Sequence, residues 1–255
     1  MKALITGASS GIGKNLAHEF ARLGYDLVLV SRTKQNLEKV KKEINYNVKV
    51  EIYPIDISNI DNCIKLHNEV KNIDILVNNA GFGLFGEFYS TSLDKEIDMI
   101  NTNIVSLHTL TKLYLQDMIK KDSGYILNVA SIAGFMPGPL MATYYATKNY
   151  VVSLSEAIKE ELNKTKSKVH ISILCPGPVK TNFDNIAGVN FSLKGKDSNY
   201  VAKYAVKKLF QKKFYIIPGK DIYLLKILKN LLPNKLIAKV VYHQQKKKDN
   251  KKRGN

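Results

Sequence analysis

The sequence predicts a doubly wound α/β fold, in which helices cover both faces of a mostly parallel, seven-stranded sheet. Short apolar runs alternate with longer segments in which apolar residues recur at helical spacing, a pattern typical of strand–helix–strand units. The short runs are apolar throughout, as expected for strands that are buried on both faces. A length of 255 residues with 45% hydrophobic residues suits a single domain of this kind.

Each element is predicted from its local pattern, in chain order. Strands are expected at Lys2–Thr6, Asp26–Val30, Val48–Pro54, Ile73–Val77, Gly124–Val129, Val169–Leu174 and Phe214–Ile217. Helices are expected at Gly11–Leu23, Lys34–Ile44, between the third and fourth strands, at Leu93–Ile119 with a bend, and at Ala142–Asn163. In the first helix, Leu16 and Phe20 lie at helical spacing, and Gly24 supplies the stop.

The C-terminal fifth of the chain differs in charge from the rest. Residues 203–255 hold 16 basic and two acidic residues, whereas residues 1–202 hold 23 basic and 20 acidic residues. We therefore divide the chain into an α/β domain at 1–220, a basic amphipathic helical extension at 221–245 and a disordered basic tail at 246–255. Pro233 divides the extension into two helices.

Several classes of protein are disfavoured. The chain runs from Met1 directly into the first strand without the pattern of a signal peptide. No run of about 18 uncharged apolar residues predicts a membrane-spanning helix. Cys63 and Cys175 are too few for a disulfide framework and lack metal-ligand spacing, so we expect two buried free thiols, no metal site and a cytoplasmic protein.

A glycine-rich turn follows the first strand. Residues 6–13 read TGASSGIG, with the spacing G-x-x-x-G-x-G. Glycines let the backbone turn tightly and approach a pyrophosphate, and the N-terminus of the next helix adds unpaired N–H groups and a partial positive charge. An ordinary strand–helix connection is the alternative, but the strand–turn–helix context favours a dinucleotide site.

Four further motifs follow the later strands in order. They are Asn78-Asn79-Ala80-Gly81 after strand four, Ser131 after strand five, Tyr144-x-x-x-Lys148 starting 13 residues later, and Pro176-Gly177 after strand six. Together with the glycine turn, they resemble the compact, single-domain, Rossmann-fold branch of the short-chain dehydrogenase/reductase superfamily over residues 1–185. The resemblance implies an oxidoreductase that interconverts a carbonyl and a secondary alcohol.

The end of the second strand bears on the cofactor. An acidic residue there would favour NAD(H), but the sequence has Ser31 and Arg32, and a guanidinium can bind a 2′-phosphate through two hydrogen bonds. In the family, Arg at this place implies NADP(H); a solvated surface Arg is the alternative. Asp56 matches the family position that contacts adenine, although it could equally cap a helix ahead of Ser58.

The resemblance assigns a set of cofactor-binding positions. They are Gly7, Ser9, Ser10, Gly11, Ile12, Gly13, Ser31, Arg32, Asp56, Asn79, Ala80, Gly81, Tyr144, Lys148, Pro176, Gly177, Val179 and Thr181. The segment that includes Val179 and Thr181 touches the nicotinamide in the family.

Tyr144, Lys148, Ser131 and Asn103 form the predicted catalytic set. Tyr144 and Lys148 lie four residues apart on a helix and share a face, so the ammonium is expected to lower the pKa of the phenol. By resemblance, Tyr144 exchanges a proton with the substrate oxygen, Ser131 donates a hydrogen bond to that oxygen, and Lys148 also holds the nicotinamide ribose. Asn103, preferred over Asn101 by its register, would hold a water that relays protons to Lys148.

Apolar residues predict the substrate pocket. By resemblance, residues 182–198 form a mobile lid. Its apolar side chains are Phe183, Ile186, Val189, Phe191 and Leu193, and the expected facing wall is Phe82, Phe85, Phe135, Met136, Pro137 and Met141. Half of these could instead be core or interface residues. No charged residue marks a substrate phosphate or carboxylate, so the substrate is expected to be an apolar carbonyl or alcohol, with 3-oxoacyl and steroid-like compounds as candidates.

Three interpretations of the basic extension stay open. It could pack on the domain with a solvated lysine face, dock on an anionic membrane surface, or recognise an acidic carrier protein or nucleic acid. No aromatic-rich basic face supports specific nucleic-acid binding. The protein is therefore expected in the cytoplasm, peripheral to the membrane in the second case.

The retained catalytic residues and the glycine spacing disfavour two other functions. A non-catalytic NADP(H)-binding membrane-surface module should have lost Tyr144, Lys148 or Ser131, and the chain keeps all three. A sugar epimerase of the extended branch would carry a different glycine spacing and a larger C-terminal domain. The resemblance also implies a homodimer or homotetramer, paired through the helices that hold Asn103 and Tyr144.

Overall fold

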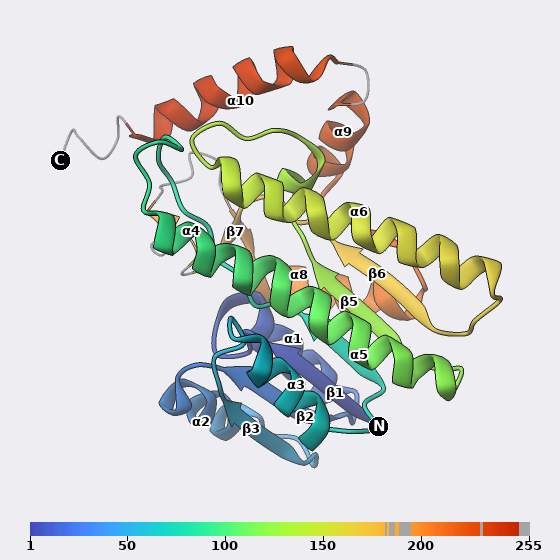
Figure 1. Cartoon of the computed structure of the whole chain (residues 1–255). Coiled ribbons are helices and arrows are strands. Elements are labelled where there is room, and N and C mark those ends of the chain that lie inside the picture. Colours follow the sequence, from blue (N-terminus) through green and yellow to red (C-terminus); the bar gives the residue numbers. More distant parts are fainter. Residues whose placement is uncertain (182, 184–186, 189–194, 230–231, 250–255) are drawn as a thin grey trace.

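The fold was taken from a computed structural model, which describes residues 1–181, 183, 187–188, 195–229 and 232–249. Its centre is a seven-stranded sheet with the order β3-β2-β1-β4-β5-β6-β9, in which every neighbouring pair is parallel (Figure 1). The strands are β1 Lys2–Thr6, β2 Asp26–Ser31, β3 Val50–Pro54, β4 Ile75–Asn78, β5 Tyr125–Val129, β6 His170–Leu174 and β9 Tyr215–Ile216. The predicted sheet is confirmed, and each predicted strand is found within two residues of its expected bounds.

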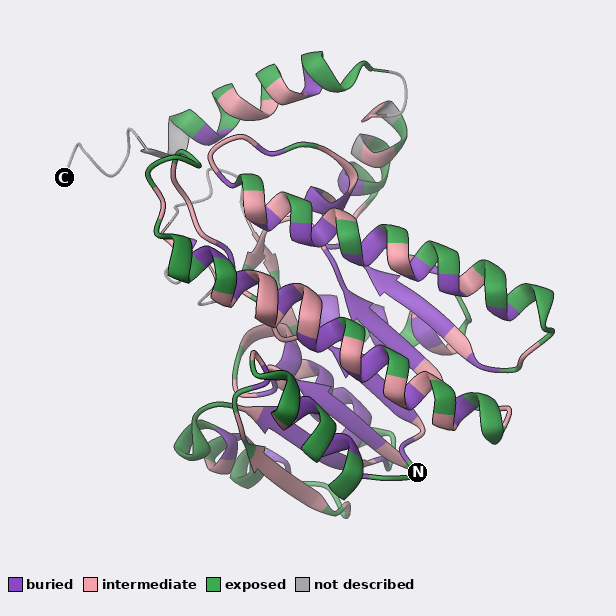
Figure 2. Ribbon diagram, in the orientation of Figure 1, coloured by how far each residue is buried: buried purple, intermediate pink, exposed green. Residues whose placement is uncertain are grey.

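Helices cover both faces of this sheet. One face carries α3 Ile60–Glu69, α5 Ser106–Lys120 and α6 Ala142–Lys164, while α4 Leu93–Ile100 packs against α6 rather than on the sheet. The other carries α1 Gly11–Arg22, α2 Lys34–Glu43 and α8 Ser198–Phe210. Figure 2 shows the central strands as mostly buried, because continuous apolar runs place a side chain in a core on each side, whereas the edge strand β3 is only half-buried.

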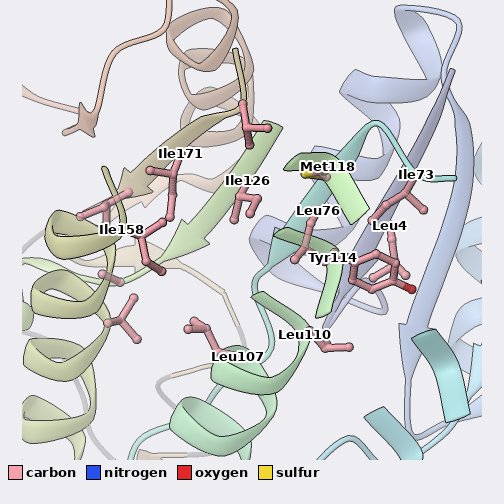
Figure 3. Close-up of a cluster of buried hydrophobic side chains, with 14 of the residues drawn as sticks. Leu4, Ile73, Leu76, Leu107, Leu110, Tyr114, Met118, Ile126, Ile158 and Ile171 are labelled. Carbon is pink, nitrogen blue, oxygen red and sulfur yellow. The ribbon is translucent and has the colours of Figure 1, made fainter. Parts of the chain in front are cut away.

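The core on the α5 side is built around aromatic and branched side chains. Tyr114 of α5 is fully enclosed among Leu4, Leu76 and Met118, and its hydroxyl donates to the carbonyl of Val70 at 3.0 Å (Figure 3). The buried phenol thus keeps its hydrogen bond while its ring fills the core. Cys63 and Cys175 are free and buried in the same core, as expected.

Helix α8 was not predicted, although its sequence contains the signals. The carboxylate of Asp197 accepts from the backbone N–H groups of Asn199 and Tyr200, which caps the first turn. Val201, Ala205 and Leu209 then recur at four-residue spacing and pack against α1. The lysines between them obscured this stripe, and no element was predicted between the loop at 182–198 and the strand at Phe214.

The predicted long helix at 93–119 is interrupted. α4 passes into a π-helical turn at Asn101–Val105 before α5 begins, so the expected bend coincides with a change in hydrogen-bond pattern. Single π turns within α-helices are frequent at functional sites. Asn103, the proposed relay residue, lies in this turn.

The basic extension forms two helices, α9 Lys220–Lys229 and α10 Asn234–Asp249, on either side of Pro233. α10 continues through Asp249, so residues 246–249, expected to be disordered, are helical; lysine is a good helix former, and the preceding Gln245 is anchored on the domain. Within the described part of the chain, no helix is long and apolar enough to cross a membrane.

The strand order reverses between β1 and β4. Connections on the two sides of this point run in opposite directions, which opens a crevice at the carboxyl ends of the strands where ligands bind in open α/β sheets. The motif-bearing segments follow β1, β4, β5 and β6 and therefore meet at this edge. A short two-stranded sheet, β7 Val179–Lys180 with β8 Lys196–Asp197, borders the same edge.

Candidate active site

The glycine turn after β1 depends on two positive φ angles and one close approach between backbone atoms. Gly7 and Gly11 have φ angles of +64° and +55°, which residues with a Cβ rarely adopt. A Cβ on Gly13, the third glycine of the turn, would stand 2.3 Å from the carbonyl oxygen of Gly7. The backbone is therefore bare at the N-terminus of α1, as binding of a pyrophosphate requires.

Asn79 fixes this turn to the end of β4. Its amide nitrogen donates to the carbonyl oxygens of Thr6 and Gly7 at 3.0 and 3.1 Å. The hydroxyl of Thr6 accepts in return from the backbone N–H groups of Asn79 and Ala80 at 3.0 and 3.1 Å. Thr6 belongs to the motif but was given no role from sequence, because its partners lie more than 70 residues away.

The end of β2 supplies unpaired polar groups. The hydroxyl of Ser31 is buried without a hydrogen-bond partner among the described residues, and Arg32 beside it is exposed and forms no ion pair within them. An orphaned buried hydroxyl beside a free guanidinium suits a ligand that brings oxygen atoms, such as an adenosine ribose with a 2′-phosphate. Together with the glycine turn, these residues fit a dinucleotide.

Asp56 was interpreted from the sequence either as an adenine contact or as a helix cap ahead of Ser58. Its carboxylate accepts from the backbone N–H of Ser58 at 3.0 Å and closes a turn ahead of α3. The N-cap of α3 is Asn59, whose side chain accepts from Asp61, so Asp56 does not cap the helix itself. Asp56 is exposed and its second carboxylate oxygen faces no described hydrogen-bond donor.

Tyr144 and Lys148 lie on the face of α6 that packs against the carboxyl ends of β5 and β6. Tyr144 is 9% exposed and Lys148 is 5% exposed. The ammonium donates to the carbonyl of Val129 at 2.9 Å and lies 5.9 Å from the centre of the Tyr144 ring. The four-residue spacing thus brings the pair together as predicted from the helix.

Burial dominates the acid–base properties of both groups. It lowers the pKa of the Lys148 ammonium to about 8. It raises the pKa of the Tyr144 phenol above its ordinary value, although a hydrogen bond with Ser131 lowers that pKa in part. The expected lowering by Lys148 is not among the causes of this shift, and burial raises the pKa because the phenolate would lose its hydration.

Ser131 begins the short 3-10 turn Ile132–Phe135 after β5. Its hydroxyl accepts from the backbone N–H of Ala133 at 3.2 Å and donates to the carbonyl of Pro176 at 3.5 Å. It also lies close enough to the phenol of Tyr144 to influence the pKa of that group, so the two hydroxyls are near each other. The backbone N–H of Ile132 donates to Pro176, which ties this turn to the segment after β6.

Asn103 is 1% exposed and joins three segments. Its amide oxygen accepts from the backbone N–H of Phe82 at 3.0 Å, and its amide nitrogen donates to the Phe82 carbonyl and the Thr147 hydroxyl. A Cβ on Gly81 would stand 2.8 Å from the Asn103 amide oxygen and 3.4 Å from the Lys148 ammonium. Gly81 therefore packs against both groups and leaves no room for a side chain. Asn101, the rival position, is only partly buried.

The segment after β6 closes the crevice from the other side. The Thr181 side chain lies against Gly11, since a Cβ there would be 3.0 Å from the Thr181 methyl group. Gly177 packs against Ile222 of α9, since a Cβ on Gly177 would lie 2.5 Å from the Ile222 side chain. Val179, in β7, packs at the edge of the core on the α1 side. The predicted nicotinamide segment thus spans from the glycine turn to the basic extension.

The remaining predicted cofactor positions lie in the same turn. Ser9 is half-buried, whereas Ser10 is exposed and its side chain makes no capping bond to α1. Ile12 packs on the core with its side chain half-buried. No group of three metal-ligating side chains occurs among the described residues.

Apolar side chains cover Tyr144. The ring of Phe183 lies 5.4 Å from that of Tyr144, and Met141, Phe82 and Phe85 join the same cluster. Phe135 instead contacts α9 and β9, where its ring lies beside Tyr215. The other lid residues named from sequence, Ile186, Val189, Phe191 and Leu193, lie outside the described residues.

A buried polar chain behind the site was missed from sequence. The amide of Asn78 donates to Thr111 and Asn128, each at 2.9 Å, and the amide of Asn128 donates to Ser155 at 2.9 Å. These bonds connect β4, β5, α5 and α6. The available signal was the presence of Asn78 and Asn128 inside otherwise apolar strands.

Comparisons with known proteins agree with this geometry. A family model described as short chain dehydrogenase matches residues 1–188. The very-long-chain 3-oxoacyl-CoA reductase-B of Danio rerio is 38% identical over 192 residues, which make up 72% of this chain and 61% of that protein. The chain therefore spans less than two thirds of that relative's length.

Two solved structures are similar over most of their length. A short-chain dehydrogenase from Sphingobium yanoikuyae in complex with NADPH has a TM-score of 0.81 and 29% identity, with 86% of this chain and 88% of that chain covered. A short-chain dehydrogenase/reductase from Burkholderia phymatum in complex with NAD also has a TM-score of 0.81, with 25% identity and 89% and 91% coverage.

Proposed function

The chain belongs to the short-chain dehydrogenase/reductase superfamily, and from this premise we propose that it is an NADP(H)-dependent oxidoreductase that interconverts an apolar carbonyl compound and its secondary alcohol. One observation carries the proposal: Tyr144, with Ser131 near its phenol, lies with the Lys148 ammonium 5.9 Å from its ring, at the crevice where the sheet order reverses. A bound nicotinamide cofactor would supply or accept the hydride.

The residues of this chain would handle the proton. Tyr144 gives its proton to the carbonyl oxygen during reduction, and Ser131 donates a hydrogen bond that stabilises charge developing on that oxygen. The phenol is protonated at neutral pH, as proton donation to the carbonyl oxygen requires. A positive nicotinamide, together with Lys148, would favour the phenolate for the reverse reaction.

Lys148 would restore the proton to Tyr144. With a pKa of about 8, its ammonium can release a proton near neutral pH. Gly81 packs against both Lys148 and the amide oxygen of Asn103, and we propose that a relay water bridges these two groups. That oxygen accepts one bond from Phe82 and keeps a second lone pair for the water.

The cofactor preference rests on Arg32. Similar solved structures hold NADPH in one case and NAD in another, so family membership alone leaves the choice open. Arg32 is exposed beside the orphaned Ser31 hydroxyl, and no acidic residue stands at the end of β2. We infer that this pair binds the 2′-phosphate of NADP(H).

The substrate is proposed to be apolar. The cluster of Met141, Phe82, Phe85 and Phe183 around Tyr144 offers a hydrophobic wall. The Danio rerio relative is named for 3-oxoacyl-CoA reduction, so long-chain 3-oxoacyl thioesters are the first compounds to test. A panel of carbonyls and alcohols of increasing chain length, assayed with NADPH and NADH in parallel, tests substrate and cofactor together; equal rates with both cofactors would contradict the role of Arg32.

We also propose a homodimer or homotetramer formed through α4, α5 and α6. Leu93 and Ile97 of α4 are 71% and 46% exposed, and His108 of α5 bonds to Tyr150 of α6 on the same outer surface. Burying such a surface between two copies would remove these apolar side chains from water. Sedimentation velocity of the wild type and of Leu93→Glu tests this assembly.

A further inference from the structure

The described part of the extension exposes large apolar side chains that have no place in the core. They are Tyr223, Leu224 and Ile227 on α9, Leu232 before α10, and Leu236 and Val240 on α10, each 46–54% exposed. We call these six residues the outer face of the extension. The green colour of much of α9 and α10 in Figure 2 marks the exposed side of these helices.

The extension is already docked on the domain by other residues. Ile222 of α9 is 4% exposed and contacts Gly177, and the Lys226 ammonium lies over the ring of Tyr215. Ile237 and Gln245 of α10 are 6% and 2% exposed, and Gln245 donates to the hydroxyl of Tyr145 at 2.9 Å. The outer face is therefore a second apolar surface that remains after the helices have packed.

Lysines accompany the outer face. Lys235 and Lys239 of α10 are exposed next to Leu236 and Val240 in sequence, and Lys246 follows near the end of the helix. Asp221, the only acidic residue between 198 and 248, is paired with Lys196 at 3.6 Å. The surface thus presents apolar groups among lysines, and Lys235, Lys239 and Lys246 form no ion pair among the described residues.

We propose that the outer face of the extension docks the protein on the surface of an anionic lipid bilayer. Aliphatic and aromatic side chains can enter the boundary between headgroups and acyl chains while lysines reach lipid phosphates. Neighbouring aromatic groups support the same orientation, since Figure 1 shows the loop before α4 near the last turns of α10 and this loop exposes Phe88 and Tyr89.

Charge favours a bilayer over a second copy of the chain. A twofold interface brings the same surface of both copies together, so the lysines around the outer face would meet each other. Such a contact places like charges side by side, which is unfavourable. An anionic bilayer satisfies the apolar groups and the positive charges at once.

The docked surface lies beside a hollow of about 570 Å³. This hollow is lined on the domain side by Phe135, Met136 and Tyr145 and on the extension side by Lys229 and Asn234. A compound dissolved in the bilayer would therefore meet the hollow next to the docked surface. The docking proposal stands independently of the proposed oxidoreductase activity.

The test is co-sedimentation of the full chain with sucrose-loaded vesicles. We expect retention on phosphatidylcholine vesicles that contain phosphatidylglycerol, weaker retention in high salt, and little retention on phosphatidylcholine alone. Lys235→Glu/Lys239→Glu/Lys246→Glu should weaken binding by at least about tenfold, because each lysine near an anionic surface contributes to attraction. Leu236→Ser/Val240→Ser should weaken it as well.

A matched control carries the same change in charge elsewhere. Lys65→Glu/Lys120→Glu/Lys164→Glu alters exposed lysines on α3, α5 and α6, and it should leave vesicle binding within about twofold of the wild type if only the outer face docks. Thermal unfolding verifies that each variant is folded. Wild-type protein that ignores anionic vesicles, or binds neutral ones equally well, overturns the proposal. So does a concentration-dependent dimer, without lipid, that Leu236→Ser/Val240→Ser abolishes.

Discussion

The glycine turn and the C-terminal extension border the same crevice but are held in opposite ways. The turn leaves no room for a single carbon atom: a Cβ at Gly7 or Gly13 would lie within 3 Å of neighbouring atoms, and Asn79 fixes its carbonyls. The extension touches the domain at a few side chains, chiefly Ile222 and Gln245, and leaves an apolar surface exposed. The conformation of the cofactor end is thus fixed by backbone geometry, whereas the position of the extension depends on side-chain contacts that tolerate substitution.

This difference predicts that substitutions near the turn and the catalytic residues cause large effects, whereas single substitutions in the extension cause small ones. The largest effect is expected at Tyr144, which lies between the two regions. Tyr144→Phe should reduce turnover by about 10²–10⁴-fold, because it removes the group proposed to transfer a proton to the substrate oxygen. Steady-state kinetics and NADPH titration measure this. Near-normal turnover with the cofactor bound would rule out the proposed chemistry.

Gly13→Ala tests whether close approach defines the turn. The new methyl group would meet the Gly7 carbonyl at 2.3 Å, so we expect a loss of about 1–3 kcal/mol in stability and a marked loss of NADPH affinity. Gly24→Ala is the matched control, since Gly24 has φ +81° but no atom within 4 Å of a built Cβ. That control should cost about 1–2 kcal/mol from backbone strain and leave NADPH affinity unchanged. Calorimetric titration separates the two effects.

Lys148→Met should raise stability while it abolishes efficient turnover. Burial lowers the pKa of Lys148 from 10.5 to about 8, so the folded protein binds this proton less tightly than the unfolded chain does. The resulting cost is present in full below pH 8 and declines as the pH rises toward 10.5. Denaturant unfolding should therefore show a gain for Lys148→Met that is larger at pH 7 than at pH 10. An equal gain at both pH values would contradict the assignment.

Arg32→Gln should change cofactor selectivity. Removing a guanidinium that binds the 2′-phosphate should raise the KM for NADPH by about 10–100-fold, the range for losing a charge-assisted hydrogen bond of about 1.5–3 kcal/mol. The KM for NADH should stay nearly constant, because NADH has no such phosphate. Arg22→Gln, which breaks the ion pair with the buried carboxylate of Glu19 on α1, is the matched control for cofactor selectivity.

Gln245→Leu is expected to have the smallest effect. It removes the bond to Tyr145, whose ring lies 6.1 Å from that of Tyr144, and should cost about 0.5–1.5 kcal/mol in stability with a change of a few fold in KM. Gln244→Leu, on the exposed side of α10, should change neither quantity. A loss of turnover as large as that of Tyr144→Phe would mean that the extension is as tightly specified as the turn.

The sequence was sufficient for the sheet, the motif order and the facing of Tyr144 and Lys148. These features follow from apolar runs, glycine spacing and the four-residue repeat of a helix, all of which are local. It was insufficient for the contacts of Thr6, Asn78 and Thr147, because each depends on which residues the fold brings together from distant positions. The raised pKa of Tyr144 also escaped prediction, since the loss of hydration depends on how Phe183 and Met141 pack around it.

The two buried cysteines can report local opening of the structure through their reaction with a thiol reagent. Burial raises the pKa of both Cys63 and Cys175 to about 12, and neither side chain is accessible to solvent. A thiol reagent can therefore react only when the structure around them separates. Cys175 directly precedes Pro176 of the nicotinamide segment, and Cys63 lies in α3. The relative rates of alkylation at the two thiols therefore compare local opening of the structure at these two places, without any introduced label.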